Sequence, residues 1–137
     1  QMGFSPPWEA APRAHEALAQ ALAIDSTRFE VQYAAAVVRT WVDWDWEVAE
    51  ETFLRGIELN PEYADLRAYY AHLLMILGRM DESAEQMALA MELDSIKPLT
   101  KALYAVALMY GLGEVDEAIP YFEQSIRVNP LNPLAQT

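Results

Sequence analysis

The chain has 137 residues, no cysteine and a formal net charge of −12 at pH 7. The lack of thiols excludes a disulfide framework, a thiolate zinc site and a cysteine nucleophile. The acidic balance disfavours nucleic acid, whose phosphates would be repelled. Hydrophobic residues make up 53% of the chain, which suffices for one domain with a core, and they are mostly Ala, Leu, Met and aromatic residues, which favours helices.

The start of the chain bears on where the protein resides. No apolar run is long enough to span a membrane, and residues 1–8 lack the basic region and apolar run of a secretory signal. A cytoplasmic location is therefore expected, with a periplasmic one left open. The Pro-rich residues 1–8 are expected to be irregular.

The first two predicted helices cover residues up to about 42. The first spans about residues 9–24, with Pro12 in its first turn, where a helix tolerates proline, and it ends at Asp25. The second spans about residues 28–42 and is apolar around much of its surface, so it should be packed on more than one side.

Two more predicted helices meet at a proline. A turn over residues 43–46 supplies Asp45 as the N-cap of a third helix, which ends at Asn60. Pro61 forbids continuation and can serve in the first turn of a fourth helix, about residues 62–77.

Glycines and acidic caps mark the rest of the chain. Gly78 is predicted to end the fourth helix in the left-handed conformation, and Gly111 and Gly113 are predicted to end the sixth. Asp81 is predicted to cap the fifth. No strand pattern is present, so the prediction is an all-α fold of about seven helices in antiparallel pairs. The last three predicted helices span about residues 81–93, 98–110 and 115–128.

One motif recurs four times along the chain. It consists of a small residue, a larger apolar residue four positions later and a second small residue three positions after that. It begins at Ala14, Ala49, Ser83 and Ala118, so the spacing is 35, 34 and 35 residues. A period near 34 with two helices per unit resembles the tetratricopeptide repeat. The resulting units are a half repeat at residues 9–26, repeats at about 28–61, 62–95 and 97–130, and residues 131–137 as a tail or the start of a further helix.

The resemblance is stronger in the second helix of each unit than in the first. Ala49, Phe53 and Pro61 match the second-helix pattern well. In the first helices of the first and third units the register stays ambiguous by one residue. The family implies an α-solenoid of antiparallel helix pairs wound into a right-handed superhelix. Residues 44–83 also resemble repeat regions attached to bacterial winged-helix regulators, adenylate cyclases and serine/threonine kinases, which implies a sensory or interaction part of a larger signalling protein.

The family also implies a function, namely a non-catalytic scaffold that binds a protein or peptide in a concave groove lined by the first helices. Here the groove would be apolar with few charges, so an apolar or basic partner is expected. The alternative is that many of these residues are core and that the register is wrong by one. The predicted partner-binding residues are Val38, Trp41, Asp65, Ala68, His72, Met75, Ile76, Leu103, Ala107 and Tyr110.

Other sites have weaker support. The family's clamp for chaperone C-terminal carboxylates needs basic residues, and none occupies the corresponding positions, which argues against that ligand. The two histidines lie on separate predicted helices without acids at ligand spacing, so no metal is expected. No phosphate loop, nucleophile elbow or carboxylate pair is present, so no cofactor and no enzymatic activity are expected. The clamp positions are Ala34, Val38, Tyr69, Thr100 and Tyr104.

Self-association is the competing prediction. Repeat arrays need polar caps at both ends, but the first predicted helix lacks its partner helix and few residues follow Pro130. Apolar side chains at the two ends could therefore join copies of the chain into a homo-oligomer. These side chains are Leu18, Leu22, Phe122 and Ile126.

Overall fold

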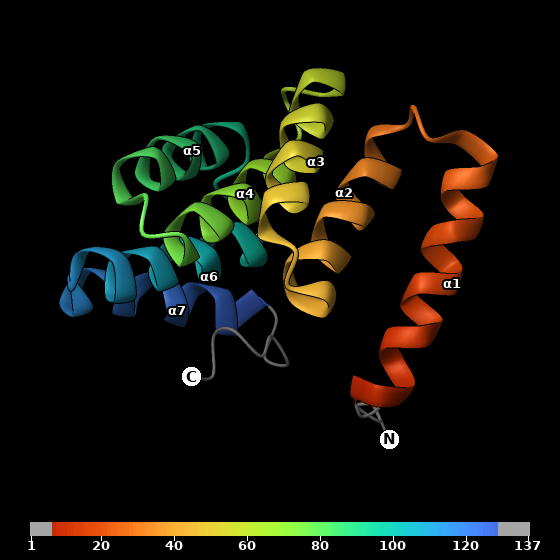
Figure 1. Cartoon of the computed structure of the whole chain (residues 1–137). Coiled ribbons are helices and arrows are strands. Elements are labelled where there is room, and N and C mark those ends of the chain that lie inside the picture. The colour runs from red at the N-terminus through yellow and green to blue at the C-terminus, as the bar shows by residue number, and fades with distance from the viewer. Residues whose placement is uncertain (1–6, 129–137) are drawn as a thin grey trace. The chain divides into compact units, whose positions relative to one another are not determined.

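The computed structural model describes residues 7–128, which form seven α-helices, two π-helical turns and no strand (Figure 1). The predicted all-α fold of paired helices is confirmed. The chain divides into two compact units, residues 1–61 and 62–137, and each is considered by itself. The predicted tail at 131–137, and residues 1–6 of the segment predicted to be irregular, lie outside the described residues.

The first unit contains one helix that packs against a helix pair. In this unit α1 packs on α2, and α2 pairs with α3. The centre of the pair is made of fully buried small and aromatic side chains, with Ala36 and Ala49 on facing helices and Phe53 beside them. The elements are α1 (Pro7–Asp25), α2 (Phe29–Val38), the π-turn η1 (Arg39–Asp43) and α3 (Trp46–Leu59).

The ends of these helices partly follow the prediction. Because α1 begins at Pro7, Pro12 lies inside the helix and not in its first turn, so that prediction is wrong. The predicted end at Asp25 is confirmed, and its carboxylate accepts hydrogen bonds from the amide and hydroxyl of Thr27 at 2.9 and 2.6 Å. Asp45 is the N-cap of α3, as predicted, and accepts a bond from the amide of Val48 at 3.4 Å.

The second unit contains two stacked helix pairs. In this unit α4 pairs with α5 and α6 pairs with α7, while α6 also packs against both α4 and α5. One buried cluster joins the first three helices, through Ala68, Ala71, Met87, Ala90 and Leu103. A second cluster, Ala105, Leu108 and Ala118, joins α7 to α6 and the turn that follows it. The elements are α4 (Ala64–Ile76), α5 (Met80–Leu93), α6 (Pro98–Val106), the π-turn η2 (Ala107–Leu112) and α7 (Val115–Val128).

Two predicted helix starts in this unit are wrong, that of α4 by two residues and that of α5 by one residue. The helix α4 begins at Ala64, so Pro61 precedes the helix and is not in its first turn. The helix α5 begins at Met80 after Arg79, which makes no side-chain capping bond. Asp81 is therefore a first-turn residue, where the helix dipole favours its charge, and not the N-cap.

The ambiguous register of the first helices has a structural explanation. Ala36, Ala71 and Ala105 are fully buried at corresponding places in the three helix pairs. Ala71 lies seven residues before the left-handed Gly78, whereas Ala36 and Ala105 lie eight residues before the left-handed Trp44 and Gly113. A π-helical turn closes i→i+5 hydrogen bonds and accommodates one more residue than an α-turn. The turns η1 and η2 thus absorb the additional residue.

Candidate partner-binding surfaces

The ten residues predicted to bind a partner are divided between the two units. Val38 ends α2 and Trp41 lies in η1, and both are half-buried. The other eight lie on α4, α6 and η2 of the second unit. The second unit therefore contains most of the predicted surface.

Four of these residues line one face of α4 at helical spacing. Asp65, His72 and Met75 are half-buried, and the side chain of Ile76 is 40% exposed. Ala68 lies on the same helix but is fully buried in the core cluster with Leu103. A ligand on this face would touch Met75 and Ile76 directly, while Ala68 would only set how closely α6 approaches.

The charge of Asp65 is compensated within the unit. Lys97, just before α6, places its ammonium 3.4 Å from Asp65 and 3.7 Å from Asp94. The same ammonium lies 5.5 Å from the ring centroid of Tyr63. Burial alone would lower the pKa of Lys97, but the carboxylates of Asp65 and Asp94 outweigh it and raise that pKa. The lysine stays charged, so the α4 face presents little net charge.

His72 contributes a neutral imidazole to this face. Its Nδ1 is buried, and desolvation by burial lowers its pKa below the ordinary value of 6.5. At neutral pH the side chain is therefore uncharged and suits an apolar or hydrogen-bonding ligand more than an anion.

The three predicted residues of α6 and η2 do not share a single face with those of α4. Leu103 belongs to the core, and Ala107 lies toward α5. Tyr110 is 68% exposed in η2. The one-residue shift described above explains this, because the positions of α6 that correspond to Asp65 and His72 are Leu99 and Val106.

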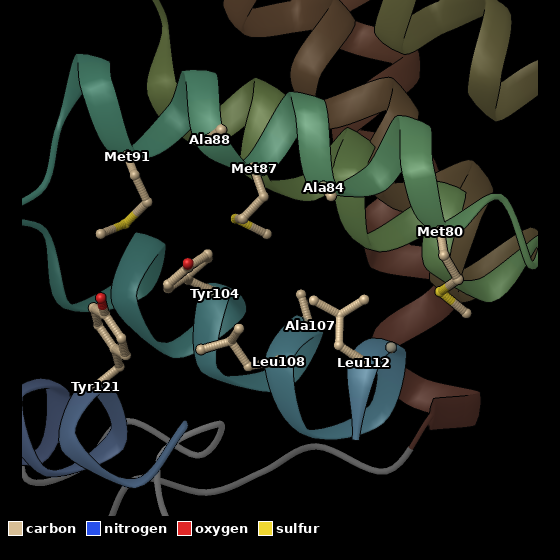
Figure 2. Close-up of a pocket in the computed structure, with 11 residues that line it drawn as sticks. Met80, Ala84, Met87, Ala88, Met91, Tyr104, Ala107, Leu108, Leu112 and Tyr121 are labelled. Carbon is tan, nitrogen blue, oxygen red and sulfur yellow. The ribbon is translucent and has the colours of Figure 1, made fainter. Parts of the chain in front are cut away.

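A pocket that the sequence did not predict lies between α5 and the α6–η2 segment, with α7 at one end. Its volume is about 300 Å³. Figure 2 shows the methionine side chains of α5 pointing toward α6 and η2, with Tyr121 at one end and Leu112 near the other. Ala107 is the one predicted site residue that lines it. The lining residues are Met80, Ala84, Met87, Ala88, Met91, Tyr104, Ala107, Leu108, Gly111, Leu112 and Tyr121.

The polar groups of this pocket are two tyrosine hydroxyls. Tyr104 and Tyr121 pack edge to face, with ring centroids 4.8 Å apart. Burial raises the pKa of Tyr104 above its usual value, and Tyr121, Glu117 and Glu114 add to that effect. The two glutamates therefore lie close enough to act on the pocket electrostatically, and no charged residue is among those that line it.

One sequence signal could have revealed the pocket. Ala84 and Ala88 are four residues apart, as are Met87 and Met91, so α5 carries a stripe of small and flexible residues beside its core stripe. The repeat pattern already explained Ser83, Met87 and Ala90 as packing residues, so it assigned no role to Ala84, Ala88 and Met91.

Within residues 7–128, no group of three or more His, Asp or Glu could hold a metal ion. None of the helices in the same range is long and apolar enough to cross a membrane.

Comparison with known proteins identifies the fold. A family model of the tetratricopeptide repeat matches residues 101–130, which include most of α6, η2 and α7. The chain has the tetratricopeptide repeat fold. In tetratricopeptide terms α2, α4 and α6 are the first helices of three repeats, and α3, α5 and α7 are the second helices. A search of curated proteins found no match.

Solved tetratricopeptide structures resemble the chain at low sequence identity. The pilF protein of Pseudomonas aeruginosa has a TM-score of 0.72 and 22% identity over 93% of this chain and 57% of its own. The first repeat domain of Spaghetti (RPAP3), solved with the HSP90 peptide SRMEEVD, has a TM-score of 0.68 and 18% identity over 82% of this chain and 87% of its own. YrrB, described as having an unusual peptide-binding site, has a TM-score of 0.66 and 21% identity over 93% of this chain and 65% of its own. These likenesses concern the fold. The tetratricopeptide fold is a protein–protein interaction module and is in general non-catalytic.

Proposed function

We propose that the chain is a non-catalytic module that binds a peptide segment of a partner protein, and that α4 carries the recognition face. The observation behind this proposal is the composition of that face. Met75 and Ile76 offer apolar area, His72 is neutral at pH 7, and the charge of Asp65 is balanced by Lys97. Such a face favours an apolar or amphipathic segment in an extended or helical conformation.

An acidic C-terminal tail is a poor candidate for this face. The HSP90 peptide solved with Spaghetti (RPAP3) ends in Glu-Glu-Val-Asp. Here the two clamp positions on α6 hold Thr100, which is fully buried, and Tyr104, which lines the pocket. Since neither is basic and the chain is acidic overall, the proposed partner is apolar or basic.

The experiment uses a displayed random-peptide library selected on the whole chain. The selected peptide is then titrated against Ile76→Ala, Met75→Ala and His72→Gln, with Leu89→Ala on the exposed side of α5 as the matched control. Loss of a contacting side chain should weaken binding by about tenfold for Ile76→Ala and leave the control unchanged. Equal affinity for all four variants would rule out the α4 face. Trp41→Ala tests the first-unit residues in the same assay.

Self-association is a second candidate, supported by the outer surface of α7. The side chains of Ile119, Ile126 and Val128 are 48%, 37% and 64% exposed. Light scattering over a range of concentrations distinguishes the two, because a dimer through this surface would dissociate on dilution and in an Ile126→Glu variant. A monomer at every concentration would exclude this candidate.

The resemblance to repeat regions of bacterial signalling proteins suggests a cellular setting. We propose that the module works in the cytoplasm as the sensory or interaction part of such a protein. Interaction of the chain with a kinase, cyclase or DNA-binding effector, measured by titration calorimetry, would support this assignment, and absence of binding to all three would contradict it.

A further inference from the structure

The pocket between α5 and the α6–η2 segment is lined by no residue of α4, so its lining differs from the α4 face. Four of its lining residues, Ala107, Leu108, Gly111 and Leu112, come from the π-turn η2. A π-turn re-aims the side chains that follow it, and such turns are frequent at functional sites. The additional residue of the third repeat therefore shapes this pocket and is not merely tolerated by the fold.

The wall contributed by α5 is both recessed and adaptable. Ala84 and Ala88 are exposed and stop at Cβ, so the helix surface is low there. Met80 and Met91 are half-buried beside them, and methionine side chains can rearrange around different apolar shapes. A volume of about 300 Å³ lies at the small end of the range for ligand pockets, which suits one or two large side chains more than a cofactor.

The charge around the pocket selects the kind of partner. Glu114 and Glu117 act on Tyr104 from the α7 side, and none of the lining residues is basic. The whole chain carries −12, so a second copy would be repelled from this rim. A segment that combines a bulky apolar side chain with nearby Lys or Arg would be attracted.

We propose that this pocket is a second docking site, which takes the apolar anchor of a basic amphipathic helix from a partner protein. The anchor would lie among Met87, Met91, Tyr104 and Leu108, and the basic residues one helical turn away would face Glu114 and Glu117. This mode buries an apolar side chain in a flexible pocket and uses the charges for orientation and rate of association.

The methionines make the test direct. The chain is labelled with ¹³C at its methionine methyl groups and titrated with a helical peptide of Lys, Leu and Ala whose leucines share one face. Met80, Met87 and Met91 line the pocket, whereas Met109 packs against the second core cluster and serves as an internal reference. The expected result is saturable shifts of the three pocket methyls with Met109 unmoved. A titration in which the signals of these three pocket methyl groups do not shift would overturn the proposal.

A matched pair of variants tests occupancy of the pocket. Ala88→Phe fills it from an exposed position, and Leu89→Phe adds the same ring to the next residue of α5, outside the pocket. Affinity should fall by more than about tenfold for Ala88→Phe and stay unchanged for Leu89→Phe. Unchanged affinity for Ala88→Phe, with the fold confirmed by circular dichroism, would overturn the site.

Peptide and acid variants test the charge argument. Replacing Lys by Glu in the peptide should abolish binding, and Glu114→Gln with Glu117→Gln should weaken binding of the basic peptide about threefold to tenfold at low salt. Equal binding of the acidic peptide would overturn the stated chemistry of the partner. The same assay distinguishes this pocket from the α4 face. A peptide whose affinity falls with Ile76→Ala but not with Ala88→Phe would bind the α4 face and not this pocket.

Discussion

The hydroxyl of Ser83 donates a hydrogen bond of 2.7 Å to the backbone carbonyl of Ala71, across the contact between α5 and α4. Both residues are buried, Ala71 completely and Ser83 to 3% exposure. The corresponding residues of the other two repeats are alanines, Ala49 and Ala118, which are also buried. This position therefore sets the distance between the paired helices, and the hydroxyl of Ser83 adds one bond to that contact.

Substitutions of Ser83 separate these two roles. Ser83→Ala removes one buried hydrogen bond but keeps the close approach, so we expect the free energy of unfolding to fall by about 1 kcal/mol. Ser83→Leu forces the helices apart and should cost about 2 kcal/mol or more. Urea unfolding followed by circular dichroism measures both. A larger loss for alanine than for leucine would show that the bond, and not the spacing, dominates.

The left-handed residues after the first helices form a natural comparison. Gly78 and Gly113 have φ of 77° and 74°, and an added Cβ would meet no atom within 4 Å at either. Alanine at either position should therefore cost about 1 kcal/mol through backbone conformation alone. Trp44 occupies the third such position with φ of 58°. Its side chain is 69% exposed, so little packing offsets the backbone strain.

Relief of this strain in the first unit should be measurable. We expect Trp44→Gly to raise stability by a few tenths of a kcal/mol, because release of the left-handed strain, about 1 kcal/mol, exceeds the loss of the tilted ring contact with Trp46. In thermal unfolding, Trp44→Gly should raise the melting temperature, whereas Gly113→Ala should lower it. A loss of more than about 1 kcal/mol would show that the Trp44 ring contributes packing that outweighs the strain.

Deletion of one residue tests the role of the π-turns. Removing the exposed Tyr110 from η2 would give the third repeat the spacing of the second, in which Ala71 lies seven residues before Gly78. We expect this deletion to be tolerated, with a loss of about 1 to 2 kcal/mol. The matched deletion of Ile76 from α4 has no additional residue to absorb it and should abolish cooperative unfolding. Equal damage by both deletions would contradict the assignment.

The sequence predicted the parts of the fold that repeat. The positions of Ala49, Ser83 and Ala118 located the second helices, because a small residue at each close contact is required wherever two helices meet in this way. The register of the first helices could not be predicted. Ala35 and Ala36 are equally small and both buried, and no residue type in the sequence marks the π-turn η1 that absorbs the additional residue.

The same limit explains what the sequence revealed about the candidate sites. Leu103 has the same residue type whether it faces a groove or the core, and a shift of one residue moved it into the core cluster. The pocket was missed for a related reason, because Met87 satisfies the repeat pattern as a packing residue and also lines a cavity. Apolar residues in a sequence predict which positions are buried, but only the structure shows whether the space between two helices is filled by side chains or left open as a pocket.

His72 should make the stability of the chain depend on pH. Burial lowers its pKa in the folded state below the ordinary value of 6.5, so at lower pH the unfolded state binds more protons than the folded state. Above about pH 7.5 the imidazole is neutral in both states and contributes nothing. As the pH falls through about 6.5, stability should decrease, and the decrease should level off once the pH is below the folded-state pKa. Urea midpoints at about pH 7.5 and about pH 5 measure this change.

The chain has two histidines, which makes the control simple. His72→Gln should lose less stability between the two pH values than the parent chain, because it removes the group whose protonation favours unfolding. Carboxylates that begin to titrate near pH 5 are common to both proteins, so the difference between the two slopes isolates His72. His15→Gln, which alters an exposed residue bonded to Asp43, serves as the matched substitution. A slope for His72→Gln equal to that of the parent chain would show that protonation of this imidazole is not coupled to unfolding.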